Sequence, residues 1–78
     1  MPAEPPSDPK LLFGTRLREL RQERNISQEE LAARAGLDRT YVSSCERGRR
    51  NIGLENLYRL AKALGVSPAD LLGHEREA

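Results

Sequence analysis

The feature of this sequence that most constrains its fold is a regular succession of helix starts and helix ends. Ser27, Asp38 and Ser67 each precede a run of helix-favouring residues, and their side-chain oxygens can accept hydrogen bonds from the free amides of a first helical turn. Gly36 and Gly65 each follow such a run, at positions where glycine adopts the left-handed backbone that ends many helices. Helix signals spaced this closely predict a bundle of short helices.

Apolar residues recur at helical spacing between these signals, so the fold class we expect is all-α, a compact domain of five helices. Leu and Ala dominate the apolar residues, and β-branched residues are sparse. The expected helices cover about residues 10–24, 28–34, 39–47 and 54–64, with a short fifth helix opening at Ser67. The side chains expected to face inward are Phe13, Leu17, Leu20, Leu31, Ala32, Ala35, Val42, Cys45, Leu54, Leu57, Ala61 and Leu64. Ser27 and Glu30 have the spacing of a reciprocal capping box.

The chain of 78 residues is long enough for one small domain. Residues 1–9 hold most of the prolines and predict a flexible arm, residues 10–73 the folded domain, and residues 74–78 a frayed tail. No apolar run approaches the length of a membrane span, and no secretory signal pattern is present. We therefore expect a cytoplasmic protein.

Charge and composition exclude several kinds of site. The single cysteine, Cys45, and the single histidine, His74, cannot form a disulfide within the chain or a Cys/His zinc site. No catalytic constellation or phosphate-binding loop is recognisable, and Ser27 is interpreted as a helix cap, so the chain is not expected to be an enzyme or to need a metal or cofactor. The net charge is only +1, but arginines cluster within residues 16–24 and 38–50. These clusters could guide a polyanion, although mixed surface charge also serves solubility alone.

The second and third expected helices are short and are joined by a turn around Gly36, which is the layout of a helix-turn-helix. Small side chains such as Ala32 and Ala35 let the two helices approach closely. The third helix is then held by one face while its other face stays free. Because an α-helix fits the major groove of B-DNA, this arrangement indicates a DNA-reading element.

Several longer runs carry a more specific resemblance. The run from Gln28 to Leu37, the segment Glu46-Arg47-Gly48 and the run from Leu57 to Leu64 resemble the lambda-repressor-like, or Xre, family of helix-turn-helix regulators. Within that family, residues 36–42 and 46–51 look most like the controller proteins of restriction–modification systems. The resemblance implies a sequence-specific transcriptional regulator, a repressor or an activator, that binds double-stranded DNA as a homodimer on a palindromic operator.

The resemblance also implies roles for individual residues. Arg39 and Thr40 match base-reading positions at the start of the recognition helix, and Ser43 lies one turn further on the same side. Arg21 and Glu46 match an ion pair that orients this helix. The residues expected to contact phosphates are Gln28, Tyr41, Ser44, Arg47, Arg49, Arg50 and Asn51. Tyr41 could instead pack against the fourth helix.

Dimerisation is expected to use apolar residues near the C-terminus. The candidates are Leu64, Val66, Leu71 and Leu72, unless they only close the core of one chain. Glu29 and Glu30 are candidates for a contact with RNA polymerase, and no small-molecule ligand is expected. Two alternatives stay open: an antitoxin-type module that binds a partner protein and regulates its own synthesis, and a domain separated from a longer regulator.

Overall fold

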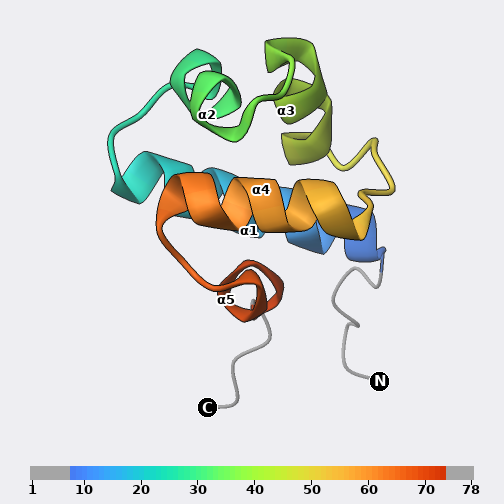
Figure 1. Cartoon of the computed structure of the whole chain (residues 1–78). Helices are drawn as coiled ribbons and strands as arrows, with labels where there is room; N and C mark the ends of the chain where they lie inside the picture. Colours follow the sequence, from blue (N-terminus) through green and yellow to red (C-terminus); the bar gives the residue numbers. More distant parts are fainter. Residues whose placement is uncertain (1–7, 74–78) are drawn as a thin grey trace, which may run out of the picture.

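The computed structural model describes residues 8–73, in which all regular structure is helical (Figure 1). The five helices are α1 (Pro9–Glu23), α2 (Gln28–Ala35), α3 (Arg39–Glu46), α4 (Leu54–Leu64) and α5 (Pro68–Leu72). Their order and bounds confirm the expected all-α architecture to within a residue or two. The remaining parts of the predicted arm and tail, residues 1–7 and 74–78, lie outside the described residues.

The first helix begins one residue before its expected start, and its capping residue lies within the expected arm. The Asp8 side chain accepts a hydrogen bond from the Lys10 amide at 2.9 Å, and Pro9 is the first residue of α1. Proline fits there because the first helical turn needs no amide donor and its fixed φ suits a helix. The proline-rich composition of residues 1–9 predicted a flexible segment and so gave no sign of a helix that starts at Pro9.

The helices pack so that α1 and α2 support α3. Helix α2 contacts α3 and α4, α3 also contacts α1, and α5 closes the far side against α1 and α4. In Figure 1, α2 and α3 lie together above α1 and α4, with α5 below. None of the helices within residues 8–73 combines the length and the apolar character needed to cross a membrane.

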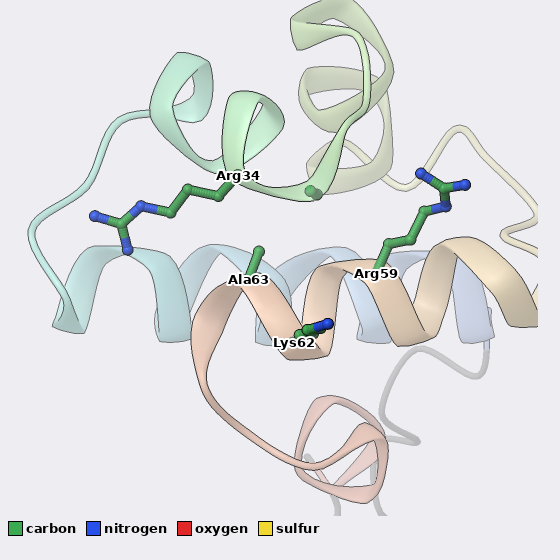
Figure 2. A pocket seen from close by; sticks show the side chains of 5 residues that line it. Arg34, Arg59, Lys62 and Ala63 are labelled. Carbon is green, nitrogen blue, oxygen red and sulfur yellow. The ribbon is translucent and has the colours of Figure 1, made fainter.

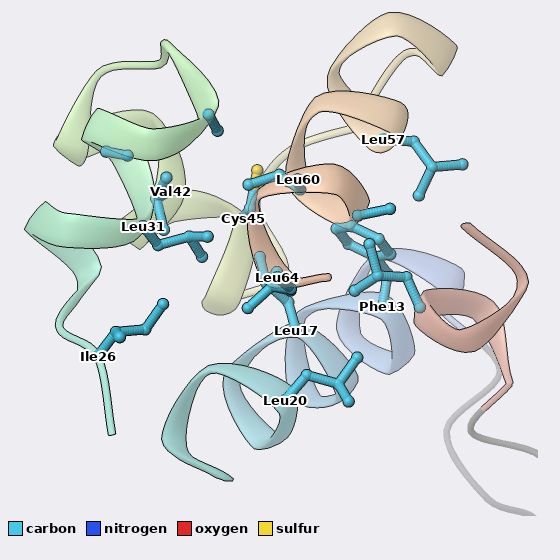
Figure 3. Packing of buried hydrophobic residues seen from close by; sticks show 14 residues of the cluster. Phe13, Leu17, Leu20, Ile26, Leu31, Val42, Cys45, Leu57, Leu60 and Leu64 are labelled. Carbon is cyan, nitrogen blue, oxygen red and sulfur yellow. The ribbon is translucent and has the colours of Figure 1, made fainter. Parts of the chain in front are cut away.

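The core lies between these layers (Figure 3). Its largest fully buried side chains are Leu17, Leu31, Val42, Cys45, Leu60 and Leu71. Cys45 is a core residue, as expected, and burial raises the pKa of its thiol. Leu54 was expected in this core but is 71% exposed, while Leu60, absent from the expected stripe, is 0% exposed. Leu54 is the first residue of α4, where the helix extends beyond the core cluster.

The helix signals are confirmed with one correction. Gly36 and Gly65 have φ values of 70° and 74°, the left-handed conformation expected after α2 and α4. The Ser27 side chain caps α2 by accepting from the Glu30 amide at 3.0 Å. The Glu30 carboxylate does not complete the expected reciprocal box, because it pairs with Arg34 at 2.6 Å. The reciprocal box occurs instead at the start of α5 between Ser67 and Asp70.

Candidate nucleic-acid interface

The last residue of α3, Glu46, anchors the recognition helix to the rest of the domain. Its side chain is fully buried and receives hydrogen bonds from Arg21 at 2.6 and 3.0 Å and from Gln28 at 2.9 Å. Arg21 also donates to the Ile26 carbonyl at 2.8 Å. The expected Arg21–Glu46 ion pair is therefore present, and it joins α1, α2 and the end of α3. A bidentate pair of this kind fixes geometry as well as charge.

Glu46 is held in its charged form. Burial raises the pKa of the Glu46 carboxyl, but the hydrogen bonds from Arg21 and Gln28 and the charges of Arg21 and Arg18 together lower it below its usual range. The hydrogen bond that Arg21 donates to Glu46 raises the pKa of the Arg21 guanidinium above its ordinary value. Both groups are therefore ionised at neutral pH, and α3 is locked in one orientation.

Two residues in this network were not predicted to take part in it. Gln28 was expected to bind phosphate, yet one proton of its amide is donated to Glu46. A second amide proton remains for another acceptor. The Nε of Arg18 lies 3.6 Å from the Glu46 carboxylate, and its side chain is about half exposed. The only sequence signal for Arg18 was its position one helical turn before Arg21.

The first turn of α3 presents two of the expected base-reading residues, Arg39 and Thr40, to solvent. Asp38 caps the helix by accepting from the Thr40 amide at 3.0 Å, and it also accepts from the Thr40 hydroxyl at 2.9 Å. Arg39 is exposed and makes no side-chain hydrogen bond within residues 8–73. Ser43 is half-buried and accepts a hydrogen bond from Arg47. The Arg39 guanidinium is therefore free to bond an external acceptor.

Ser44 was expected to contact phosphate, and the structure contradicts this. Ser44 is 8% exposed, its hydroxyl donates to the Tyr41 carbonyl at 2.9 Å, and the same oxygen accepts from the Arg50 Nε at 2.9 Å. Because this buried hydroxyl already donates one hydrogen bond and accepts another inside the chain, it is not available to a phosphate. Ser44 instead helps to hold the guanidinium of Arg50, which lies 5.1 Å from the centre of the Tyr41 ring.

Tyr41 packs against the core and against α4, the alternative considered for it. Its half-buried ring packs against the core, and its hydroxyl accepts from the Asn56 amide of α4 at 3.0 Å. The loop that follows α3 presents Arg47, Arg49 and Asn51 on the surface, beside the anchored Arg50. The loop therefore lies directly beside the end of the recognition helix, which carries Tyr41.

The residues expected to form the dimer need correction. Leu64 is 4% exposed and Leu71 is 0% exposed, so both are used up in closing the core of a single chain. Val66 is half-buried against that core, and only Leu72 of the four is well exposed, at 51%. Apolar residues are frequent near the C-terminus because the short helix α5 packs against both α1 and α4.

Comparison with known proteins places this geometry in a family. The helix-turn-helix family model matches residues 17–71. The chain is 52% identical to the control protein C.BamHI of Bacillus amyloliquefaciens over 64 residues, covering 81% of this chain and 79% of that protein. It superimposes with a TM-score of 0.78 on the restriction–modification controller protein C.AhdI of Aeromonas hydrophila, with 52% identity, covering 80% of this chain and 94% of the other.

A further similar structure contains DNA. The tetramer of the restriction–modification controller protein C.Esp1396I in complex with its natural 35 base-pair operator matches with a TM-score of 0.78 and 32% identity, covering 87% of this chain and 90% of that one. The expected resemblance is thereby confirmed over most of the described residues. This chain belongs to the helix-turn-helix family of Xre-like, DNA-binding transcriptional regulators, which are not enzymes.

Proposed function

We propose that this chain is a controller-type regulator that binds a palindromic operator as a homodimer and controls a restriction–modification operon. The observation that carries the proposal is the free, exposed Arg39 on a recognition helix whose far end is locked by Glu46. A reading helix must be held rigidly to discriminate bases, and its reading side chains must not be consumed by internal bonds. The similarity to C.BamHI and C.AhdI supports the operon assignment.

The side chains around α3 divide into two functions. Arg39 is suited to bidentate hydrogen bonds with guanine, while the Thr40 methyl and the Ser43 hydroxyl are suited to neighbouring base edges. The residues proposed to bind phosphates are Gln28, Tyr41, Arg47, Arg49, Arg50 and Asn51. These phosphate contacts set affinity and register, whereas the base contacts set specificity.

A contact with RNA polymerase is a separate proposal that concerns activation. Glu29 is exposed at the first turn of α2, beside the proposed DNA surface, and makes no ion pair within residues 8–73. Glu30, the second candidate, is paired with Arg34. Glu29 is therefore the stronger candidate. Glu29→Gln should reduce transcription from an activated promoter without changing operator affinity, whereas loss of affinity would assign Glu29 to the fold or to DNA.

The test of the main proposal is selection of binding sequences from a random duplex pool, for the natural chain and for Arg39→Ala at the same salt concentration. The natural chain should enrich a two-fold symmetric motif. The variant should lose preference at one base pair in each half-site, at a cost of about 1–3 kcal/mol. Arg34→Ala, which removes an arginine from the exposed face of α2, is the matched control and should leave the motif unchanged. If the natural chain enriches no motif, the antitoxin-type module becomes the better interpretation.

A further inference from the structure

The guanidinium of Arg50, in the loop after α3, is held by two different groups of the folded chain. Its Nε donates a hydrogen bond to the Ser44 hydroxyl at 2.9 Å, and its Cζ atom lies 5.1 Å from the centre of the Tyr41 ring. At that distance a cation is attracted to the face of an aromatic ring. A hydrogen bond to one nitrogen and a ring beside the cation together leave the side chain few other orientations.

The two groups that hold Arg50 are themselves fixed by the fold. Ser44 is 8% exposed and its hydroxyl donates to the Tyr41 carbonyl at 2.9 Å, so toward Arg50 its oxygen acts as an acceptor. The Tyr41 ring packs against the core, and its hydroxyl accepts from the Asn56 amide of α4 at 3.0 Å. The Ser44 hydroxyl and the Tyr41 ring are called the Arg50 cradle below.

The cradle leaves the binding end of Arg50 free. An arginine side chain has five N–H donors, and the cradle uses the one on Nε. The residue is exposed, and neither of its terminal nitrogens donates a hydrogen bond within residues 8–73. Four N–H groups therefore remain for an external oxyanion such as phosphate, which a guanidinium can bind through two parallel hydrogen bonds.

The other arginines of the loop are placed differently. Arg47 donates to the hydroxyl of Ser43. The Arg49 side chain forms neither a hydrogen bond nor an ion pair within residues 8–73, although its backbone amide donates to the Ser44 carbonyl at 2.9 Å. Ser44 therefore holds the loop twice, by its carbonyl at the Arg49 backbone and by its hydroxyl at the Arg50 side chain.

Arginines around the hollow between α2 and α4 have no such cradle. Figure 2 shows Arg34 and Arg59 extending in opposite directions from this hollow. Arg34 pairs with Glu30 of its own helix, and the Arg59 side chain forms no hydrogen bond or ion pair in the described part of the chain. Neither guanidinium is thus oriented by a hydrogen bond from a second element, as that of Arg50 is.

Such an arrangement favours binding because an arginine that contacts phosphate loses the freedom of its side chain. Immobilising one such side chain at an interface weakens binding by roughly two- to tenfold. Since Ser44 and Tyr41 already restrict Arg50 in the DNA-free protein, less freedom is lost when DNA binds.

We propose that Ser44 is a positioning residue, which holds Arg50 in its phosphate-binding orientation before DNA arrives and does not itself contact DNA. The proposal rests on the proposed function, which places Arg50 among the phosphate contacts. It gives the buried Ser44 hydroxyl a role in DNA affinity that its lack of exposure hides.

The first measurement concerns the DNA-free protein. The heteronuclear NOE of each arginine Nε reports side-chain motion on the picosecond to nanosecond scale. In the natural chain the Nε of Arg50 should be more restricted than the Nε of Arg49. Ser44→Ala should make the two equally mobile. Equal mobility already in the natural chain would overturn the proposal.

The second measurement is a double-mutant cycle on operator affinity. Ser44→Ala should weaken binding by roughly two- to tenfold per subunit, and this effect should disappear in the Arg50→Ala background. In the Arg49→Ala background, the matched control, the effect should persist in full, because the Arg49 side chain does not contact the Ser44 hydroxyl. An equal effect of Ser44→Ala in both arginine backgrounds would assign Ser44 to the structure alone.

Arg50→Lys gives a second test without any change at a buried residue. Lysine keeps the charge at this exposed position but lacks the planar guanidinium that the cradle holds. This variant should therefore bind the operator more weakly than the natural chain, with a similar dependence on salt. An Arg50→Lys chain that binds as tightly as the natural chain would show that the held guanidinium contributes nothing.

Failure of this proposal is distinguishable from failure of the proposed function. Circular dichroism and urea unfolding check that each variant is folded. If the natural chain binds its operator while Ser44→Ala acts independently of Arg50, the positioning role is overturned and DNA binding stands. If Arg50 is restricted but the natural chain binds no duplex, the DNA-binding role is refuted and the positioning role with it.

Discussion

At the scale of single residues, the behaviour of Glu46 follows from its partners. A carboxylate buried without partners would lose its charge, yet Glu46 receives hydrogen bonds from Arg21 and Gln28 that hold the ionised form. Because its pKa is lower in the folded chain than in the unfolded chain, its stabilising contribution is present above the unfolded value of about 4.3. That contribution is lost as the pH falls through the folded-state value.

Glu46→Gln should therefore change stability in a manner that depends on pH. At neutral pH the variant should be less stable by about 1.5–3 kcal/mol, because the Arg21 guanidinium loses its charged acceptor. As the pH falls below the unfolded value of about 4.3, the difference should shrink, because Glu46 takes up a proton in the unfolded chain before it does so in the folded chain. Urea unfolding followed at several pH values measures both effects. Glu55→Gln, at an exposed glutamate, is the control, and a difference that does not vary with pH would contradict the assigned charge state.

At the scale of elements, the close approach of α1 and α3 depends on Gly14. A Cβ built at Gly14 would lie 2.4 Å from the Cys45 carbonyl oxygen and 2.7 Å from that of Glu46. Both atoms belong to the backbone, so they cannot move aside as a side chain would. The missing side chain at Gly14 thus sets how near the end of the recognition helix lies to α1, and with it the reach of Arg21 to Glu46.

Gly14→Ala tests this packing. Alanine favours a helix more than glycine does, by about 1 kcal/mol, so an exposed glycine replaced in this way would stabilise the chain. Here the clash with α3 should prevail and lower the free energy of unfolding by about 1–3 kcal/mol. Thr15→Ala at the neighbouring exposed position is the matched control. Thermal and urea unfolding measure the change, and a stabilised Gly14→Ala would show that the two helices separate easily.

Asp38 tests whether the start of the recognition helix matters for reading DNA. Asp38→Ala removes the acceptor for the Thr40 amide and hydroxyl, and loss of an N-cap typically costs about 0.5–2 kcal/mol. Arg39 and Thr40 should then be held less rigidly, so operator affinity should fall more than stability alone explains. Asp38→Asn keeps a capping oxygen, so this variant should retain most of the stability and most of the operator affinity. Equal operator affinity in Asp38→Ala would contradict a role for the cap in recognition.

At the scale of the whole molecule, function depends on where charge is placed and little on its total. The chain carries a net charge of only +1, but Arg47, Arg49 and Arg50 lie in one loop beside the recognition helix. Binding that neutralises phosphates releases counterions, so affinity should fall steeply as salt rises. The number of phosphate contacts can therefore be read from the salt dependence of binding.

Arg49→Ala is expected to flatten that salt dependence. Each lost phosphate contact lowers the slope of log K against log salt by about 0.9, so a dimer should lose about 1.8. Specificity should stay unchanged, in contrast to Arg39→Ala, which should alter base preference. Operator binding titrated at four or more salt concentrations measures the slope. An unchanged slope for Arg49→Ala would remove this residue from the phosphate contacts.

The sequence by itself determined the five helices and most of their caps, because caps, glycine stops and helical spacing are local and depend on few neighbours. The Arg21–Glu46 pair joins residues 25 apart, and only the family resemblance indicated it. Tertiary structure decided what local patterns leave open: the exposure of Leu54, the burial of Leu64 and Leu71, and the internal use of Ser44. Helical spacing tells which residues share a face, but only the packed neighbours decide whether that face is covered. For the same reason Leu64 and Leu71, which share a helical face with their expected partners, are covered within one chain.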